Sequence, residues 1–260
     1  SEQSKNNIEK LLSKNTFSMT TGHQLCLFTG PLYFIYKIIS SLNLSEKLKE
    51  KYPKKDFIPI FWMATEDHDF QEVNHINLFG EKIEWDSKQS GPVGQMKPKG
   101  IKKVLDELKV TLGESKNAQQ LIQLFENAYL KHSSLADATR YLVNELFGKY
   151  GLLIIDGDDK WLKEQSLHII QKDILQNGFV KSIQECSNEL VKNYKVQAHV
   201  RDVNFFKLSN EKRELIKEGV TANEIEKEPE KFSPNVLMRP LYQESILPNI
   251  AYIGGGAEVA

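Results

Sequence analysis

The 260-residue sequence contains only two cysteines, Cys26 and Cys186. Two thiols cannot form a disulfide framework, which excludes the class of small secreted proteins that disulfides stabilise. The sequence also has no apolar run of about 18 residues, the length that a membrane-spanning helix needs. Its first ten residues are polar and do not resemble a secretion signal. These absences predict a cytoplasmic protein with no membrane partner.

A surplus of either charge is also absent. The sequence has 34 Lys and Arg residues against 35 Asp and Glu residues, a net charge of -1. Proteins that bind nucleic acid electrostatically usually carry a clear positive surplus. The basic run KPKGIKK at 97–103 is followed by Asp106 and Glu107, and we interpret it as a solvated loop before a helix. We therefore expect no nucleic-acid partner.

Strand and helix patterns alternate along the chain, which predicts an α/β fold with a mostly parallel sheet. Three segments, 57–64, 151–156 and 249–255, are short and nearly continuous apolar runs. Such runs are typical of strands that are buried on both faces. A shorter, half-apolar segment at 16–21 is a fourth candidate strand. Together they predict the core sheet.

Two segments between the predicted core strands have a different character. Residues 76–148 begin with small strands and continue into amphipathic helices. Residues 195–232 contain candidate strands at 196–200 and 204–208, followed by a charged, irregular stretch at 211–231. The predicted core therefore comprises residues 1–75, 149–194 and 233–260, with insertions at 76–148 and 195–232.

Ligands in an open parallel sheet bind outside the carboxyl ends of the strands, where loops and helix N-termini converge. The first such end is TGHQLCLFTGP at 21–31, and its glycines would let the backbone approach a ligand closely. Pro31 occupies a favourable first position for a helix, whose positive end would face that ligand. The spacing matches neither a Walker A loop nor a GxGxxG fingerprint. A tight turn before a helix is the alternative, and it explains Gly30 and Pro31. It gives no packing role to His23 and Gln24, and we therefore favour a ligand-binding role for this segment.

The second strand end carries a cluster of ionisable side chains. Glu66, Asp67, His68, Asp69 and Glu72 follow the apolar run at 57–64. Carboxylates at the ligand edge could hold a ribose, a magnesium ion or a substrate amine, and His68 could exchange protons near neutral pH. A solvated loop is the alternative interpretation. The position after a buried strand favours a catalytic role.

Part of this cluster has a spacing that zinc sites also show. His68, Glu72 and His75 follow the pattern H-x3-E-x2-H. No thiolate or third histidine lies nearby in sequence, and we therefore expect no metal site. His23 and Cys26 could approach the pattern in space, which leaves a catalytic zinc as the alternative.

The third strand end is the acidic turn at 156–159. Asp156 stands at the terminus of the strand, and we expect it to be functional. A plain helix cap is the simpler interpretation of Asp158 or Asp159.

The last part of the chain adds a cation and a glycine-rich loop. Arg239 can pair bidentately with a carboxylate or a phosphate. Three successive glycines at 254–256, followed by Glu258, could cradle a ligand with their backbone. A flexible hinge is the alternative for the glycines.

Four motifs together resemble one known family. They are TTGHQLCLFTGPLYFIYK, PIFWMATEDHDFQEVNH, GLLIIDGDD and FSPNVLMRPLYQESILPNIAYIGGGAEVA, in that order along nearly the whole chain. The sequence is identified by them as a member of the bacillithiol-biosynthesis cysteine-adding enzymes, the BshC family. His23 and Cys26 are less usual variants of the first motif, so the resemblance does not assign a role to either.

The resemblance implies a Rossmann-like core with two connecting-peptide insertions, akin to class I aminoacyl-tRNA synthetases. It implies a ligase that joins L-cysteine to the amino group of glucosaminyl-malate. It also implies a C-terminal coiled coil that makes the full-length protein a homodimer. Because the sequence stops at Ala260, we expect this part to be missing here.

Amide formation from a free carboxylate at neutral pH needs an activated acyl group, and we expect an acyl-adenylate formed from ATP with Mg²⁺. A nucleotidyltransferase, a ligase for another amino acid and a non-catalytic nucleotide-binding module remain alternatives on the same scaffold. We expect the catalytic residues to be Glu66, Asp67, His68 and Asp69. We expect the nucleotide- or substrate-binding residues to be Gly22, His23, Gln24, Gly30, Tyr33, Lys37, Asn74, Asp156, Asn235, Arg239, Gly254, Gly255, Gly256 and Glu258.

Overall fold

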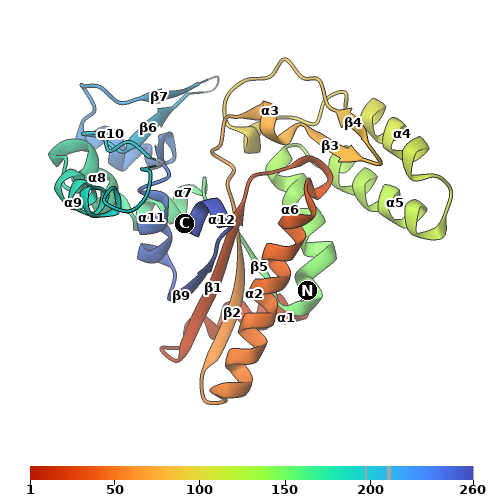
Figure 1. Cartoon of the computed structure of the whole chain (residues 1–260), viewed down its shortest axis with the longest axis horizontal. Coiled ribbons are helices and arrows are strands. Elements are labelled where there is room, and N and C mark those ends of the chain that lie inside the picture. Colours follow the sequence, from red (N-terminus) through yellow and green to blue (C-terminus); the bar gives the residue numbers. More distant parts are fainter. Residues whose placement is uncertain (197, 210–211, 260) are drawn as a thin grey trace. The chain divides into compact units, whose positions relative to one another are not determined.

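A computed structural model describes residues 1–196, 198–209 and 212–259 of the chain. The chain forms two compact units, which are described separately (Figure 1). The first comprises Ser1–Gly157 and Pro248–Ala260, and the second comprises Asp158–Leu247. The second unit includes residues 158–194 and 233–247, which the predicted domain boundaries assign to the core. Those boundaries stay a prediction.

The first unit contains a four-stranded parallel sheet with the strand order β5-β2-β1-β9. Its strands are β1 (Thr16–His23), β2 (Asp56–Met63), β5 (Leu153–Asp156) and β9 (Asn249–Ile253). The apolar runs form strands because both of their faces are covered, and Ile60, Phe61 and Met63 of β2 are fully buried. The predicted α/β fold with a Rossmann-like parallel sheet is thus confirmed. The relation to synthetase cores stays a prediction.

Helix α2 (Leu32–Lys51) packs along β1 and β2. Its apolar stripe buries Phe34 and Ile38, and the hydroxyl of Ser41 donates to the carbonyl of Met19 at 2.7 Å. Pro31 is the residue before the helix, with an extended backbone, rather than its first helical residue. A short helix that the sequence analysis did not anticipate, α1 (Glu2–Lys10), contacts β5.

The segment at 76–148 is mostly helical, as predicted, and a small hairpin begins it. The hairpin pairs β3 (His75–Leu78) with β4 (Glu81–Glu84). The buried Ile83 of this hairpin belongs to the same hydrophobic cluster as Phe34 of α2 and Phe61 of β2. The insertion and the sheet therefore share one core. The elements that follow the hairpin are η2 (Val93–Gln95), α4 (Ile101–Leu112), α5 (Lys116–Lys131), α6 (Leu135–Phe147) and η3 (Gly148–Tyr150). Outside this segment, η1 (Leu27–Thr29) lies between β1 and α2, and α3 (Phe70–Val73) lies between β2 and β3.

The second unit packs helices against a small antiparallel sheet with the order β7-β6-β8. Its core includes Ile170, Phe205 and Phe232. Its elements are α7 (Lys160–Gln165), α8 (Leu167–Gln176), α9 (Val180–Leu190), β6 (Phe205–Leu208), β7 (Arg213–Leu215), α10 (Ala222–Lys227), η4 (Pro229–Lys231), β8 (Phe232–Pro234) and α11 (Arg239–Ile246).

The structure corrects two expectations about the segment at 195–232. The strand predicted at 204–208 is present as β6, but the described residues of 196–200 form no strand. Residue 197 lies outside the described residues. The stretch at 211–231 is not irregular, since it contains β7, α10 and η4. These short elements depend on packing within the unit, which a charged local sequence does not reveal.

The last described element is α12 (Gly256–Val259), which follows β9. Ala260 lies outside the described residues. None of the helices in the described part of the chain combines the length and apolar character that crossing a membrane requires.

Candidate functional site

The parallel sheet brings several predicted site residues to one edge of the first unit. His23 at the end of β1 is in register with Met63 at the end of β2, and Met63 is in register with Asp156 at the end of β5. Thr21 is in register with Ile253 at the end of β9. The segments that leave these strand ends therefore begin side by side, as the parallel topology requires. They carry Gly22, His23, Gln24, Glu66, Asp67, His68, Asp69, Asp156, Gly254, Gly255, Gly256 and Glu258.

Gln24 connects two carboxylates at this edge. Its amide nitrogen lies 2.7 Å from Oδ2 of Asp67 and 2.7 Å from Oε2 of Glu72. An amide group has two N–H bonds, so one side chain can donate to both acceptors. Gln24 thereby holds two negative charges together beside the end of β1. The sequence analysis placed Glu72 in the ionisable cluster but did not anticipate this pairing.

Asp67 also orders the loop that follows β2. Its Oδ1 atom accepts hydrogen bonds from the backbone N–H groups of His68 at 2.7 Å and Asp69 at 3.2 Å. The side chain of His68 is 54 % exposed, and its Nδ1 lies 3.8 Å from the same carboxylate. Asp69 is exposed, and Glu66 is partly buried. Among the four predicted catalytic residues, Asp67 contacts Gln24, the residue after β1.

His23 is a neutral base at this edge. Burial is the main cause that lowers the pKa of its imidazole, which packs against Phe34 at 5.1 Å between ring centroids. Its Nδ1 lies 3.1 Å from the carbonyl oxygen of Gln24, which can only accept. The proton of the neutral ring is therefore on Nδ1, and Nε2 carries a lone pair that can accept a proton.

Cys26 lies next to His23 but is not an activated nucleophile. Its Sγ is 3.7 Å from Nδ1 of His23. Burial, followed by the negative charges of Glu72 and Asp67, raises the pKa of its thiol to about 12. Thiol reactivity requires the thiolate, and Cys26 therefore stays protonated and unreactive near neutral pH.

The middle of the first motif is buried instead of facing a ligand. Residues 25–28 pack into the core that the sheet shares with the insertion. Phe28 lies 4.9 Å from Phe125 between ring centroids, and its N–H donates to the hydroxyl of Tyr129 at 2.9 Å. Phe28, Thr29 and Gly30 all have positive φ angles. This compact turn also packs Gly30 onto Cys26, where a Cβ atom would lie only 2.4 Å from the Cys26 Cβ. Close packing and a positive φ angle thus explain why residue 30 is a glycine. Backbone that could cradle a ligand is left only at the two ends of the motif.

Lys37 and Glu258 form an ion pair between α2 and the segment after β9. Nζ of Lys37 lies 2.6 Å from Oε2 of Glu258. The backbone N–H of Gly255 donates to the same oxygen at 2.7 Å, and the hydroxyl of Tyr252 lies 3.2 Å from Oε1. The carboxylate of Glu258 thus accepts three donors that come from three segments of the chain.

One of the three glycines at 254–256 is required by close packing. A Cβ atom on Gly255 would lie 1.4 Å from the hydroxyl oxygen of Tyr33, whereas a Cβ on Gly256 would meet nothing within 4 Å. Tyr33 in turn lies under Nζ of Lys37, which is 5.5 Å from the ring centroid. Gly255 therefore lets the loop approach α2 closely.

Two residues that the sequence analysis missed contact Asp156. The hydroxyl of Thr65 donates to Oδ1 of Asp156, and Nη2 of Arg140 lies 3.8 Å from Oδ2. Nη1 of Arg140 also donates to the carbonyl of Ile154 at 2.8 Å. Arg140 lies in the middle of α6, about 16 residues before Asp156 in the sequence. The amphipathic pattern of α6 predicts a helix but not a contact between Arg140 and Asp156.

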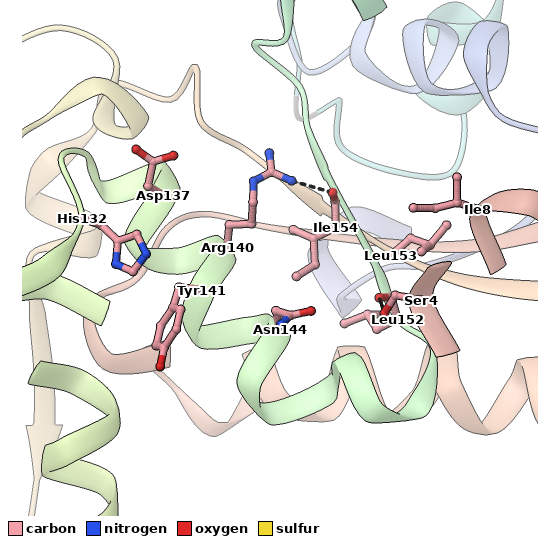
Figure 2. A pocket seen from close by; sticks show the side chains of 10 residues that line it. All are labelled: Ser4, Ile8, His132, Asp137, Arg140, Tyr141, Asn144, Leu152, Leu153 and Ile154. Atoms are coloured by element: carbon pink, nitrogen blue, oxygen red, sulfur yellow. Dashed lines mark hydrogen bonds between the residues drawn. The ribbon is translucent and has the colours of Figure 1, made fainter. Parts of the chain in front are cut away.

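Arg140 also lines a pocket of about 400 Å³ beside the outer edge of β5 (Figure 2). Figure 2 shows its guanidinium directed toward the carbonyl of Ile154, with Asn144 one turn further along the same helix. The sequence analysis did not anticipate this pocket. Its lining residues are Ser4, Ile8, His132, Asp137, Arg140, Tyr141, Asn144, Leu152, Leu153 and Ile154.

Asn74 makes its contacts inside the first unit's insertion. It is buried, and its amide donates to Glu84 at 3.0 Å and to the carbonyl of Trp85 at 3.3 Å. Its Oδ1 lies 3.1 Å from Nδ1 of His75. These contacts fix the β3–β4 hairpin and occupy the side chain, so a direct binding role for Asn74 finds no support.

Asn235 and Arg239 belong to the second unit. Oδ1 of Asn235 accepts the N–H groups of Leu237 at 2.9 Å and Met238 at 3.0 Å, which orders the turn before α11. Arg239 is the first residue of that helix. Asp159 caps α7 by accepting the N–H of Leu162, as predicted. The binding roles of Asn235 and Arg239 stay predictions.

No group of three or more His, Cys, Asp or Glu side chains in the described ranges has the geometry of a metal site. His75 and Glu72 of the H-x3-E-x2-H pattern make the separate contacts given above, with Asn74 and Gln24.

Comparisons with known proteins agree with the sequence motifs. A family model described as "Bacillithiol biosynthesis BshC, N-terminal Rossmann-like domain" matches residues 1–260. A protein of Flavobacterium johnsoniae named "Putative cysteine ligase BshC" is 48% identical over 276 residues, covering 100% of this chain and 52% of the relative. A protein of the same name from Cytophaga hutchinsonii is 41% identical over 277 residues, covering 100% of this chain and 51% of the relative.

The chain spans about half the length of the curated relatives it matches. The family match nevertheless extends over the whole of the chain, and it names the Rossmann-like fold that the parallel sheet displays. The chain therefore belongs to the bacillithiol-biosynthesis BshC family, in which it corresponds to the N-terminal Rossmann-like domain.

Proposed function

We propose that the protein is a cysteine ligase of bacillithiol biosynthesis that forms an amide bond. The acyl donor would be L-cysteine, and the acceptor would be the amino group of glucosaminyl-malate. The relatives' name supports a ligase that uses cysteine. The sequence motifs support the choice of acceptor through the family resemblance.

One observation carries the proposal: a set of acceptors and a set of donors lie on the same edge of the parallel sheet. The acceptors are His23 Nε2 and the Asp67–Glu72 pair that Gln24 bridges. The donors surround the carboxylate of Glu258. Acyl transfer to an amine requires both, because a proton leaves the amine while negative charge develops on oxygen.

The carboxylate pair suits the amine substrate. An amine binds as its ammonium form near neutral pH, and two adjacent carboxylates attract that charge. The ammonium must lose a proton before it can attack, since the protonated form has no lone pair. His23 is neutral and has a free acceptor nitrogen, so it supports proton removal as well as the predicted bases Asp67 and His68.

The donors suit an anionic group of the acyl-activating substrate. ATP would activate the cysteine carboxylate by taking it onto its α-phosphate and releasing pyrophosphate, and Mg²⁺ would screen the phosphates and bind to one or two carboxylates. Lys37 and the N–H of Gly255 would hold the phosphate oxygens.

The reaction can be tested with protein expressed from the complete gene. The protein is incubated with cysteine, glucosaminyl-malate and ATP, and the amide product is measured by mass spectrometry, with each substrate omitted in turn. ATP–pyrophosphate exchange is measured with cysteine and with other amino acids. Product that requires all three substrates supports the proposal. Exchange that depends on a different amino acid, or substrate binding without any product, would overturn it.

The resemblance also supports a homodimer in the cytoplasm for the complete protein. Multi-angle light scattering on the product of the complete gene measures the oligomeric state, and a monomer at micromolar concentration would contradict the dimer.

A further inference from the structure

The carboxylate of Glu258 lies where three donors converge. Lys37 reaches it from α2 at 2.6 Å, the N–H of Gly255 from the glycine loop at 2.7 Å, and the hydroxyl of Tyr252 from β9 at 3.2 Å. Three donors directed at one oxyanion, one of them positively charged, are the arrangement that proteins use to bind carboxylates and phosphates. In this chain the bound oxyanion is a side chain of the protein itself.

The charged donor is more deeply buried than the acceptor. The side chain of Lys37 is only 5 % exposed, whereas that of Glu258 is 31 % exposed. A buried ammonium group is costly unless an anion compensates it, so Lys37 requires a partner at this position. Glu258 supplies that partner from α12, a helix of four residues. Another oxyanion could compensate the same buried charge.

The carboxylate of Glu258 is partly open to solvent, since its side chain is 31 % exposed. A Cβ atom on Gly256, two residues earlier, would also meet no atom within 4 Å. Gly255, by contrast, is pressed against Tyr33, which keeps its N–H beside Lys37. The donors would thus stay in place when Glu258 moves away.

We propose that Lys37, Tyr252 and the N–H of Gly255 form an oxyanion subsite that Glu258 occupies until a phosphate or carboxylate group of a substrate displaces it. The inference deepens the proposed ligase and rests on it for the identity of that substrate. Glu258 keeps the buried Lys37 compensated in the free protein. It also lowers the apparent affinity for the substrate anion, because a ligand can bind only the fraction of molecules whose subsite is open.

The test measures the binding of pyrophosphate and of malate to the full chain by isothermal titration calorimetry. Glu258→Gln keeps the size of the side chain and removes the competing charge. We expect it to strengthen the binding of at least one of the two anions by about tenfold, the gain expected if nine in ten molecules have the subsite closed. Glu46→Gln removes one negative charge from the exposed surface of α2 and should change neither affinity.

The two anions identify the source of the oxyanion. Tighter binding of pyrophosphate alone assigns the subsite to a nucleotide phosphate. Tighter binding of malate alone assigns it to a substrate carboxylate. Lys37→Met keeps an apolar stem of similar length and should abolish the gain in the Glu258→Gln background. If that variant does not fold by circular dichroism, Tyr252→Phe removes one donor and should reduce the gain several-fold.

Two results would overturn the subsite: an unchanged or weaker affinity for both anions in Glu258→Gln, or a gain that persists after Lys37→Met. Neither binding measurement requires catalytic turnover. The binding experiments therefore test the subsite separately from the proposed ligase activity. If the amide product never forms but Glu258→Gln still binds an anion more tightly, the proposed function fails and the subsite stands. If the product forms and the affinities do not respond, the ligase stands and the subsite fails.

Discussion

The amide nitrogen of Gln24 lies 2.7 Å from Oδ2 of Asp67, and this contact joins the residue after β1 to the loop after β2. The same nitrogen reaches Glu72. One neutral side chain thereby sets the spacing of two carboxylates at the carboxyl edge of the sheet. Gln24 has no acid–base chemistry of its own, so we expect it to act by positioning the two carboxylates.

Replacing Gln24 with Met should reduce product formation by about a hundredfold, the scale of a misplaced reacting group. The change removes both hydrogen bonds and leaves two like charges without their shared donor. Initial rates at saturating substrate measure the effect. Gln123→Met is the matched control, because Gln123 is exposed on α5 and donates to Asn127. Equal rates for Gln24→Met and the wild-type protein would contradict a positioning role.

Replacing Gly255 with Ala should destabilise the folded protein by about 1–3 kcal/mol, as overpacking usually does. The new methyl group would overlap the hydroxyl of Tyr33, which it would meet at 1.4 Å. Urea unfolding of the full chain measures the change. Gly256→Ala has space around its new methyl group and should cost much less. Adding Tyr33→Ala should recover part of the loss, and no recovery would show that the clash lies elsewhere.

Cys26 should resist alkylation in the folded protein. Its thiol is buried and its pKa is raised to about 12, so the reactive thiolate is rare at pH 8. Cys186 is exposed and should react with iodoacetamide under the same conditions. Mass spectrometry should find a single label, on Cys186, and a second label only after unfolding in urea. Rapid labelling of Cys26 without urea would contradict the buried, protonated thiol.

The lowered pKa of His23 predicts how stability depends on pH. The unfolded chain takes up a proton on this ring as the pH falls below about 6.5, the usual value. The folded protein does so only at lower pH, because burial disfavours the charged ring. The unfolded state is therefore favoured by acid, and His23 contributes a fall in the free energy of unfolding as the pH drops below 6.5.

The variant His23→Gln lacks this titration. Its free energy of unfolding should decrease less than that of the wild-type protein between pH 6.5 and pH 5, as measured by urea unfolding. A parallel decrease in both proteins would show that burial does not hold His23 neutral.

Arg140 should act through Asp156. Arg140→Met removes the cation 3.8 Å from the Asp156 carboxylate and the hydrogen bond to Ile154, and it should lower product formation about tenfold. In a double-mutant cycle the effect of Arg140→Met should largely disappear once Asp156 is changed to Asn. Asn144→Ala, in the same pocket, is the control. Additive effects of the two changes would show that Arg140 acts independently of Asp156.

The core strands could be predicted from the sequence because their signal is local. The run FIPIFWM at 57–63 has no polar face, and its short length and its aromatic and β-branched residues favour a strand covered on both sides. Parallel strands place their carboxyl ends on one edge, so the positions of His23, Asp67, Asp156 and Gly254 relative to the sheet followed from the same signal. The motifs were also sufficient to identify the family.

The side-chain pairings at that edge were decided by the tertiary structure alone. Gln24 and Asp67 are separated by 43 positions, and Lys37 and Glu258 by 221. No periodicity or turn preference extends over such distances, because these properties depend only on neighbouring residues. A contact between distant residues forms when the packed core fixes both backbones.

The first motif, at 20–37, contains one feature that the local sequence predicts and one that only the tertiary structure decides. Its sequence correctly placed a turn between a strand and a helix at the carboxyl edge of the sheet. It did not reveal that residues 25–28 are buried beside Phe125 and Tyr129. Those aromatic residues lie about a hundred positions further along the chain, in a helix of the insertion. Only the folded core brings that helix against the motif, since burial depends on which surfaces meet and a local pattern cannot specify its distant partner.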